Sequence, residues 1–371
     1  PPRSTLFPYT TLFRSSAVDH SPLVDGFYKT QSNSVWIDNL KADITYSTPW
    51  LQVSLGRDNF QIGNSISGSI ILNNECNEYG YALAEGTFGR FKLSLLHGTL
   101  IADDPVSIYE HETVANSKHY PEKNLALHQI TYTNTDRFEL FFGESVIYGD
   151  RGLDVNYLMP QAFWRVTEHN LQDRDNILIY GGINLKPLAK TTIYTQAVID
   201  EMRYKEFMGN WWGNKWAVQS GVSRFFGKED KGRIGFEFTA VRPWIYTHYL
   251  PYTPYSHDSK PLGYPKGSNL IDYSAELNYS MNWQTSITAK ASYTRQGSTG
   301  NNFNINYLTY VPDIDNTTAD WLQGTVSDTF SLNTIVKSSF FAHHNILLGH
   351  KACYDKVSWD HLFFGAWQVV Y

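Results

Sequence analysis

The sequence lacks long apolar runs, and this absence excludes one large class of membrane protein. No stretch approaches the roughly 18 consecutive apolar residues that a transmembrane helix needs, and the mean hydropathy is only −0.37. The sequence also lacks a Walker-type loop, a dinucleotide fingerprint and a Gly-x-Ser-x-Gly elbow before a helix. A helical membrane span is therefore excluded, and we expect neither a cofactor nor enzymatic activity.

Cysteine and net charge are also scarce. The two cysteines, Cys76 and Cys353, stand far apart in the chain and in no metal-ligand spacing. We expect two unrelated free thiols, with one disulfide bridge as the alternative. The 30 Lys and Arg residues and the 36 Asp and Glu residues leave a net charge of −6 with no basic block. This distribution argues against nucleic acid as a partner.

What the chain does have is a strict alternation of apolar and polar residues from residue 50 to its end. In residues 51–56 the apolar set is Leu51, Val53 and Leu55, and the residues between them are polar or glycine. The same pattern recurs in residues 91–95, 138–140, 193–199, 234–238, 275–279 and 287–293. Such a period of two is typical of strands with one apolar and one polar face. Many such strands can protect their edges in a sandwich, a propeller or a closed barrel.

Aromatic content and loop spacing favour the barrel. The chain contains 25 Tyr, 21 Phe and 11 Trp, more than the core of a soluble domain needs, and aromatic girdles at two membrane interfaces would use this excess. Short turn signals alternate with long irregular stretches at residues 102–124, 242–269 and 301–322. We therefore predict an all-β fold, a large antiparallel transmembrane β-barrel of about 14 to 18 strands.

The N-terminus follows a different pattern. Residues 5–15 resemble a translated sequencing-adapter oligonucleotide, and they contain no charged region followed by an apolar one, as a signal peptide would. We interpret residues 1–15 as non-native, residues 16–34 as an irregular lead-in and residues 35–371 as the barrel. On this interpretation the barrel is truncated at its N-terminus, and a missing signal peptide says nothing about localisation.

Four segments extend beyond a simple pattern. Together they resemble, in order and spacing, the Wzi capsule-assembly family, particularly its Bacteroidetes versions. The segments are residues 54–58 (SLGRD) with Gly63 and 68–74 (GSIILNN), residues 142–152 (FGESVIYGDRG) with 156–160 (NYLMP), residues 215–221 (KWAVQSG), and residues 247–269 with 255–257 (YSH) and 261–263 (PLG). The resemblance covers most of residues 35–371, and residues 142–152 are its most specific part. Gln61 and Ile62 depart from the family pattern, which has an aromatic residue before the glycine that corresponds to Gly63.

The resemblance implies a function as well as a fold. It implies an outer-membrane barrel of a Gram-negative bacterium that contacts outer-membrane lipid and binds capsular or extracellular polysaccharide as a lectin. Two alternatives stay open. One is an outer-membrane channel for small solutes. The other is a soluble β-rich carbohydrate-binding protein, in which the alternating apolar residues would point inwards.

A loop dense in aromatic and polar residues is the first candidate for the carbohydrate site. Sugar rings lie on aromatic faces while their hydroxyl groups bond to polar side chains. The predicted contacts are Trp244, Tyr246, His248, Tyr249, Tyr252, Tyr255 and His257. The alternative is that the tyrosines belong to an interfacial girdle. No metal site is predicted, because neither these histidines nor His111, His119 and His128 have a convincing ligand spacing.

Other polar residues fall on the faces that a barrel would turn towards its lumen. Among them, Glu237, Glu276 and Lys290 are expected to belong to a filling of paired charges, with the lining of a solute path as the alternative. The remaining members of this set are Arg137, Glu139, Gln196, Asp200 and Asn278.

Glu144, Arg151 and Tyr157 form a separate motif at a strand-to-loop transition. We expect Glu144 to pair with Arg151 and fix the turn. Hydrolysis by Glu144 with Asp150 or Asp154 is not expected. The strand rise of about 3.3 Å per residue separates such carboxylates too far unless the chain turns.

Overall fold

The computed structural model describes residues 9–10, 27–31, 34–102, 121–203, 205, 209–305, 307–311, 313, 315–340 and 344–369, with side chains between residues 40 and 367. Apart from β1 (Tyr9–Thr10), the segment interpreted as non-native lies outside the described residues, as do His111 and His119. β2 (Phe27–Gln31), in the expected lead-in, pairs with β3 (Ser34–Asn39), and β1 completes this small sheet. β3 lies almost wholly within the predicted barrel range of residues 35–371, but it belongs to this separate sheet.

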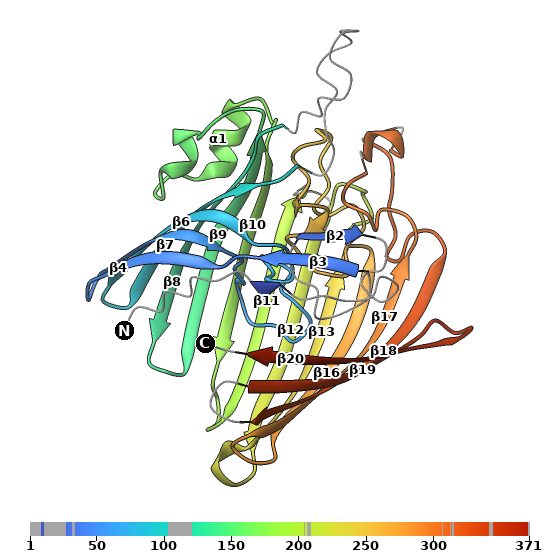
Figure 1. Cartoon of the computed structure of the whole chain (residues 1–371). Coiled ribbons are helices and arrows are strands. Elements are labelled where there is room, and N and C mark those ends of the chain that lie inside the picture. The colour runs from blue at the N-terminus through green and yellow to red at the C-terminus, as the bar shows by residue number, and fades with distance from the viewer. Residues whose placement is uncertain are drawn as a thin grey trace.

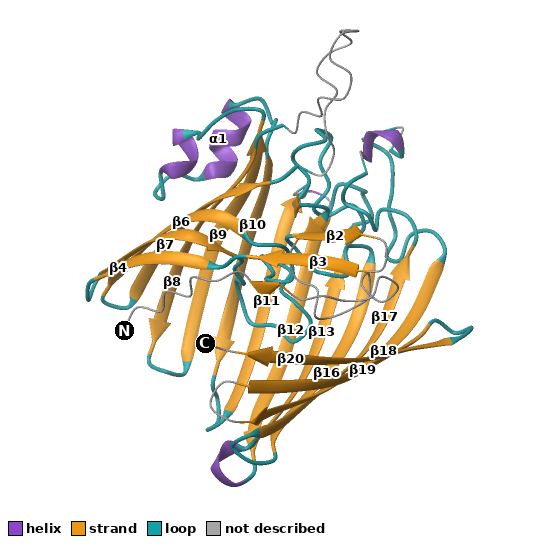
Figure 2. Ribbon diagram, viewed as in Figure 1, coloured by secondary structure: helices purple, strands orange, loops and turns teal. Residues whose placement is uncertain are grey.

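One antiparallel sheet of 15 strands organises the rest of the described chain (Figures 1 and 2). Its strands are β4 (Ala42–Ser47), β5 (Leu51–Asp58), β6 (Tyr79–Phe88), β7 (Phe91–Leu100), β8 (Lys123–Asn134), β9 (Phe138–Gly149), β10 (Asn176–Leu185), β11 (Thr191–Glu201), β12 (Lys215–Phe226), β13 (Gly232–Val241), β16 (Leu270–Ser280), β17 (Thr285–Gly297), β18 (Val326–Phe340), β19 (His344–Tyr354) and β20 (Trp359–Val369). The predicted all-β barrel architecture and strand number are confirmed. Among the described residues, β4 and β20 are the two ends of the curled sheet.

Few other elements interrupt this sheet. They are α1 (Trp164–Asn170), the 3₁₀ helices η2 (Val155–Leu158), η4 (Lys228–Asp230) and η5 (Tyr307–Thr309), and a small hairpin of β14 (Ser256–His257) and β15 (Lys260–Pro261). Within the described part of the chain, none of the helices is both long enough and apolar enough to cross a membrane.

The connections between strands differ at the two ends of the sheet. At one end they are short, as in residues 135–137 and 281–284, and we name this the short-turn end. At the other they are long, as in residues 150–175, 242–269 and 298–325, and we name this the long-loop end. This asymmetry was expected from the turn signals and is typical of outer-membrane barrels.

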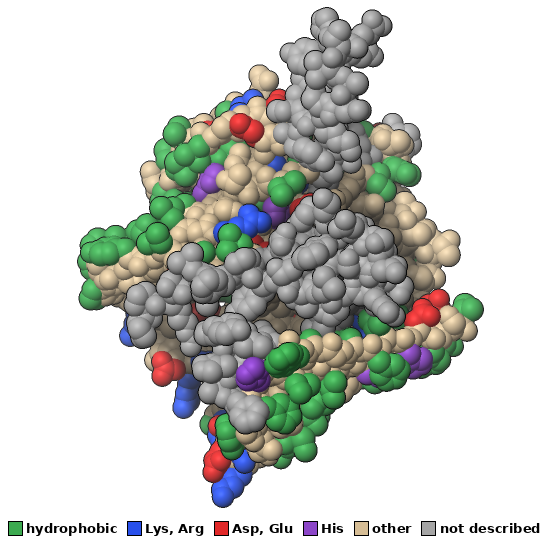
Figure 3. Space-filling model, viewed as in Figure 1, with side chains coloured by type: hydrophobic (Ala, Val, Ile, Leu, Met, Phe, Trp, Pro, Cys, Tyr) green, Lys and Arg blue, Asp and Glu red, His purple; other side chains and the backbone are tan. Residues whose placement is uncertain are grey.

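The two faces of the strands differ in polarity. In β13, Ile234, Phe236 and Phe238 are exposed, while Glu237 and Thr239, which alternate with them, are buried. Hydrophobic side chains gather on the outside of the sheet near both of its end strands (Figure 3). A soluble protein buries its apolar face, whereas a membrane barrel turns it towards lipid. The apolar residues of the alternating pattern therefore face outwards. The soluble alternative would require them to face inwards.

Exposed aromatic side chains form two bands on this outer face. Near the long-loop end the band contains Tyr273, Tyr293, Phe330 and Trp359, and near the short-turn end it contains Phe226, Tyr279, Trp283, Phe340 and Trp367. The ten steps along β18 from Phe330 to Phe340 span roughly 33 Å. Strand tilt reduces this length to about the 25 Å height of an outer-membrane apolar belt.

The connection between β5 and β6, residues 59–78, folds inwards and is here named the plug. Backbone N–H groups of Ile66 and Ser67 donate to the Glu237 carboxylate at 2.8 and 3.0 Å. The Tyr246 hydroxyl donates to the carbonyl of Ile70 at 2.6 Å, and the Tyr255 hydroxyl to that of Ile71 at 2.9 Å. Hydrogen bonds to its main chain therefore fix the plug to β13 and to the 242–269 loop.

Apolar side chains complete this filling. Ile70, Ile71 and Leu72 of the plug are at most 1% exposed and pack in one cluster with residues from β8, β10 and the 242–269 loop. The prediction that the lumen is filled by paired charges is therefore wrong in its main part, because a folded segment of chain fills it. Glu237 binds main-chain N–H groups, whereas Glu276 does pair with Arg233 at 3.1 Å. Lys290 stands opposite Glu276 in the β16–β17 register.

Candidate functional site

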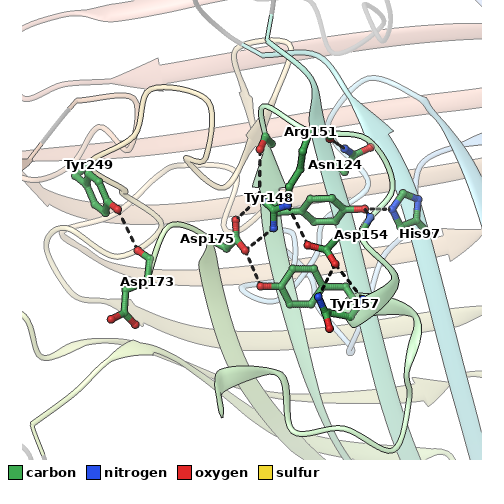
Figure 4. A network of polar contacts seen from close by, with 11 residues as sticks. His97, Asn124, Tyr148, Arg151, Asp154, Tyr157, Asp173, Asp175 and Tyr249 are labelled. Carbon is green, nitrogen blue, oxygen red and sulfur yellow. Dashed lines mark hydrogen bonds and ion pairs between the residues drawn. The ribbon is translucent and has the colours of Figure 1, made fainter. Parts of the chain in front are cut away.

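The predicted motif around residue 150 anchors the loop between β9 and β10 (Figure 4). Arg151 donates two hydrogen bonds to the Asp175 carboxylate, at 2.9 and 2.7 Å, and a third to Asp154 at 3.0 Å. The Tyr157 hydroxyl donates to Asp175 at 2.6 Å. Burial disfavours the charge on Arg151, but the hydrogen bonds and charges of Asp175 and Asp154 outweigh it and raise its pKa. A bidentate pair of this kind fixes geometry as well as charge.

Glu144 anchors the other half of this loop. It is fully buried and accepts hydrogen bonds from the N–H groups of Trp164 and Arg165 at 2.7 and 3.0 Å, at the start of α1. Its oxygen lies 2.9 Å from Nε2 of His128, whose ring stacks on Trp164. The predicted pairing of Glu144 with Arg151 is therefore wrong. Glu144 faces His128 across the β8–β9 ladder, so its partners come from that strand and from α1.

These anchors position one wall of a cavity of about 340 Å³ at the long-loop end, here named the long-loop cavity. Its lining comes from the α1 region, the ends of β10, β11 and β12, the 242–269 loop and η5. The lining residues are Arg165, Glu168, His169, Asp173, Asp175, Asn176, Ile177, Asp200, Glu201, Lys215, Thr247, His248, Tyr249 and Tyr307. Five of them are carboxylates and only two are permanent cations, so the cavity is acidic.

Ion pairs and rings organise the interior of this cavity. Nζ of Lys215 lies 3.1 Å from a Glu201 oxygen and 4.3 Å from the centre of the Tyr307 ring. Arg165 pairs with Glu168 at 2.6 Å. Burial raises the pKa of Glu168 to about 7 despite the opposing charge of Arg165. Burial also lowers the pKa of His248 to about 3, so its ring is neutral at pH 7.

The structure separates the seven predicted carbohydrate contacts into two groups. His248 and Tyr249 line the long-loop cavity, and Tyr252 is half-buried nearby in the same loop. The other four are at most 3% exposed. They are Trp244, Tyr246, Tyr255 and His257.

Each of these four has a packing role. Tyr246 and Tyr255 stack at 5.7 Å and hold the plug. Trp244 lies against Tyr310, and Nδ1 of His257 accepts the N–H of Ile101. They therefore form neither an open sugar platform nor an interfacial girdle, because the loop folds into the lumen.

Sequence reasoning missed most of the cavity. Apart from the two predicted loop residues, and from Asp200, which was predicted only as a lumenal residue, its wall comes from segments far apart in the chain. One signal was present, since acidic pairs stand at strand boundaries at Asp173 and Asp175 and at Asp200 and Glu201. All of these boundaries lie at the long-loop end.

A cation could be held at one corner of the cavity. Glu168, His169 and Asp173 bring one potential ligand atom each to within 4.8 Å of one another in the described part of the chain. Each already has a protein partner, since His169 lies 2.7 Å from Asp173 and Glu168 pairs with Arg165. The absence of a metal therefore remains a prediction.

A second cavity of about 590 Å³ lies at the short-turn end, here named the short-turn cavity. Its lining residues are Asn64, Thr133, Thr135, Asp136, Arg137, Phe138, Glu139, Asn184, Lys186 and Thr192. Acidic and basic side chains balance here, and Phe138 supplies the single aromatic ring. Asn64 of the plug donates to Asn184 at 2.7 Å, so the plug forms part of this cavity's wall. The long-loop cavity is the better candidate because it combines several rings with convergent polar groups.

Comparison with known proteins supports the fold. No protein-family model matches the sequence, and no curated protein sequence matches it significantly. The structure is similar to Wzi of Escherichia coli, described as an outer-membrane protein involved in group 1 capsule assembly and a carbohydrate-binding β-barrel. The identity is 12%, 93% of this chain and 72% of that chain are covered, and the TM-score is 0.58. This chain therefore has the fold of an outer-membrane β-barrel.

Two further solved structures show a weaker likeness. OccK5 of Pseudomonas aeruginosa is 9% identical over 91% of this chain and 83% of its own, with a TM-score of 0.46. A porin of Rhodopseudomonas blastica is 10% identical over 97% and 96%, with a TM-score of 0.41. Scores this low support no inference about this chain.

Proposed function

We propose that the protein is an outer-membrane lectin that binds capsular or extracellular polysaccharide in its long-loop cavity. The observation that carries this proposal is the cavity itself. Rings of Tyr249 and Tyr307 and five carboxylates share one space of about 340 Å³. Sugars need this combination, because their C–H faces lie on rings and their hydroxyl groups donate to carboxylates. The solved neighbour Wzi, described as carbohydrate-binding, has the same kind of fold.

The membrane location is part of this proposal. Its support is the apolar outer face of the sheet and the two aromatic bands that border it. Such a barrel contacts outer-membrane lipid of a Gram-negative bacterium, and its long loops face the outside. Folded protein in detergent should migrate faster on a gel before boiling than after it. A chain that stays soluble and monomeric without detergent would contradict the location.

Binding without catalysis or transport fits the interior best. Glu144, the carboxylate of the most specific motif, is buried and occupied by main-chain N–H groups. The alternative function as a channel has less support, because the plug packs across the lumen with an apolar cluster.

Two measurements on the same preparation test the proposal. Titration calorimetry of the detergent-solubilised chain against capsular or extracellular oligosaccharides should give saturable binding, and planar bilayers should show no steady conductance. Tyr249→Ala should weaken the binding. Porin-like conductance together with no sugar binding would replace the lectin proposal by the channel.

A further inference from the structure

We propose that the long-loop cavity selects a sugar carrying a free amine, whose ammonium group lies among carboxylates and tyrosine rings, over an acidic sugar. The inference rests on the proposed function and deepens it by naming the class of ligand. Three observations carry it: the charge of the lining, the use of its cations, and the way in which the wall already holds one ammonium group.

The lining carries an excess of negative charge. Asp173, Asp175, Asp200 and Glu201 face the cavity, and the permanent cations in the lining are Arg165 and Lys215. Glu168 also lines the cavity, but its pKa of about 7 leaves it mostly protonated at pH 6. A uronic acid or a phosphorylated sugar would add a further anion to this set. Like charges at close range repel strongly in a space partly removed from water.

The cations of the wall are already engaged with protein carboxylates. Lys215 is 2% exposed and pairs with Glu201, and Arg165 pairs with Glu168. Asp175 forms an ion pair with Arg151, which does not line the cavity. Asp173 pairs with His169 at 2.7 Å, and Asp200 accepts the N–H of Tyr246 at 2.8 Å and feels the charge of Lys215. In the described residues neither carboxylate forms an ion pair with Lys or Arg. A cationic ligand can therefore still bind to them.

The wall itself shows how an ammonium group is held here. Nζ of Lys215 lies 4.3 Å from the Tyr307 ring centre, 4.8 Å from the Trp212 ring centre and 3.1 Å from Glu201. Carboxylates and aromatic faces together favour an organic cation, because the rings add cation–π attraction. Tyr249 offers a further ring on the open side, beside Asp173, whose carbonyl it contacts at 3.2 Å.

A metal ion is the less suitable occupant. The candidate ligand group of Glu168, His169 and Asp173 occupies one corner only. Aromatic rings contribute nothing to a hard divalent ion, which prefers oxygen ligands throughout its coordination sphere. The cavity volume of about 340 Å³ also accommodates a sugar ring rather than one ion.

The experiment compares three trisaccharides that differ mainly in charge. Calorimetry on the full chain in detergent at pH 6 would use the glucosamine trimer, the N-acetylglucosamine trimer and the galacturonic acid trimer. We expect the amine trimer to bind about tenfold more tightly than the acetylated trimer at low salt, and the acidic trimer to bind least. Salt should reduce the difference because it screens charges.

Variants locate the effect in the cavity. Asp173→Asn combined with Asp200→Asn keeps the shape and the acceptor for the Tyr246 N–H but removes both charges. This variant should bind the amine trimer and the acetylated trimer with similar affinity. Asp136→Asn, at an exposed carboxylate of the short-turn cavity, is the matched control and should keep the preference.

The outcomes separate this inference from the proposed function. Binding of none of the sugars tested, including capsular oligosaccharides, would overturn the lectin proposal itself. Equal binding of amine and acetylated trimers, or tighter binding of the acidic trimer, would overturn the inference and leave the lectin proposal standing. Binding that requires calcium and disappears with a chelator would also overturn it, in favour of a metal-bridged ligand.

Discussion

The two cavities of the barrel differ more in construction than in size. The short-turn cavity is larger, about 590 against 340 Å³, but strand ends and tight turns build it, and its charges balance. The long-loop cavity is built by chain that leaves the sheet, folds over and is anchored by buried ion pairs. The comparison shows that the volume of a cavity is a poor guide to the position of a binding site in a barrel. Anchored loops that bring rings and unbalanced charge together are the better guide.

The largest expected effect concerns the anchoring of the loops. Glu144→Ala removes a buried acceptor shared by two N–H groups of α1 and by His128. We expect it to destabilise the barrel by about 3 kcal/mol, since buried donors lose their partner. Glu139→Ala at the short-turn cavity removes one bond, to Asn184, and should cost about 1 kcal/mol. Urea unfolding followed by tryptophan fluorescence would measure both, and equal losses would erase the distinction between the ends.

A pH-dependent effect should be confined to the long-loop end. The pKa of Glu168 in the folded chain is about 7, above its ordinary value of 4.5, so the folded state holds this proton more tightly than the unfolded state does. This contribution to stability is complete below about pH 4.5 and is lost as the pH rises through 7. The charged groups facing Glu168 are Arg165, Asp173 and Asp175.

Glu168→Gln should reduce the loss of folding stability between about pH 4.5 and pH 7 by about 2 kcal/mol. Thermal melting in detergent at pH 5 and pH 8 would measure it. Glu139→Gln at the other end should leave the decline unchanged. If wild type and Glu168→Gln lose the same stability between these two pH values, the burial of Glu168 has no role in it.

Ring contacts should matter at one end only. Tyr249→Ala in the long-loop cavity should weaken sugar binding about tenfold, because a stacked ring contributes roughly 1 kcal/mol beyond its area. Phe138→Ala in the short-turn cavity removes the ring found there and should leave the affinity unchanged. Calorimetry with the same oligosaccharide compares the two, and a loss in the Phe138 variant alone would move the site to the short-turn end.

The smallest effect sharpens the contrast between plug and strands. Both cysteines are free, with Cys76 buried in the plug and Cys353 half-buried in β19. Burial raises the pKa of Cys76 to about 12, so it holds almost no reactive thiolate. A maleimide should label Cys353 first in the native barrel, as mass spectrometry would show. Rapid labelling of Cys76 would mean that the plug leaves the lumen readily.

The sequence was sufficient for the parts of the molecule that depend on a local period. Alternation such as Ile234, Phe236 and Phe238 against Glu237 sets the two faces of a strand, and the aromatic excess indicates which face meets lipid. The lengths of the connections indicated the two ends. All of these signals lie within a few neighbouring residues, so they do not depend on how distant segments meet.

The site could not be predicted in the same way, because distant segments assemble it. The loop holding Tyr246 and Tyr255 is polar and aromatic, as a sugar platform would be, yet the inward fold of the plug buries both rings. Glu144 takes partners from β8 and α1 rather than from nearby Arg151, because the register of two strands decides which groups meet. Neither the inward fold nor the register leaves a mark within a short stretch of sequence.

Blocking one cavity at a time tests the central claim most directly. In a Cys353→Ser background, His169→Cys places a thiol at the exposed wall of the long-loop cavity, and Asp136→Cys places one at the short-turn cavity. A bulky maleimide would then fill either space before oligosaccharide binding is measured by calorimetry. The account predicts loss of binding after labelling residue 169 and unchanged binding after labelling residue 136. Unchanged oligosaccharide binding after labelling residue 169, together with loss of binding after labelling residue 136, would contradict the account.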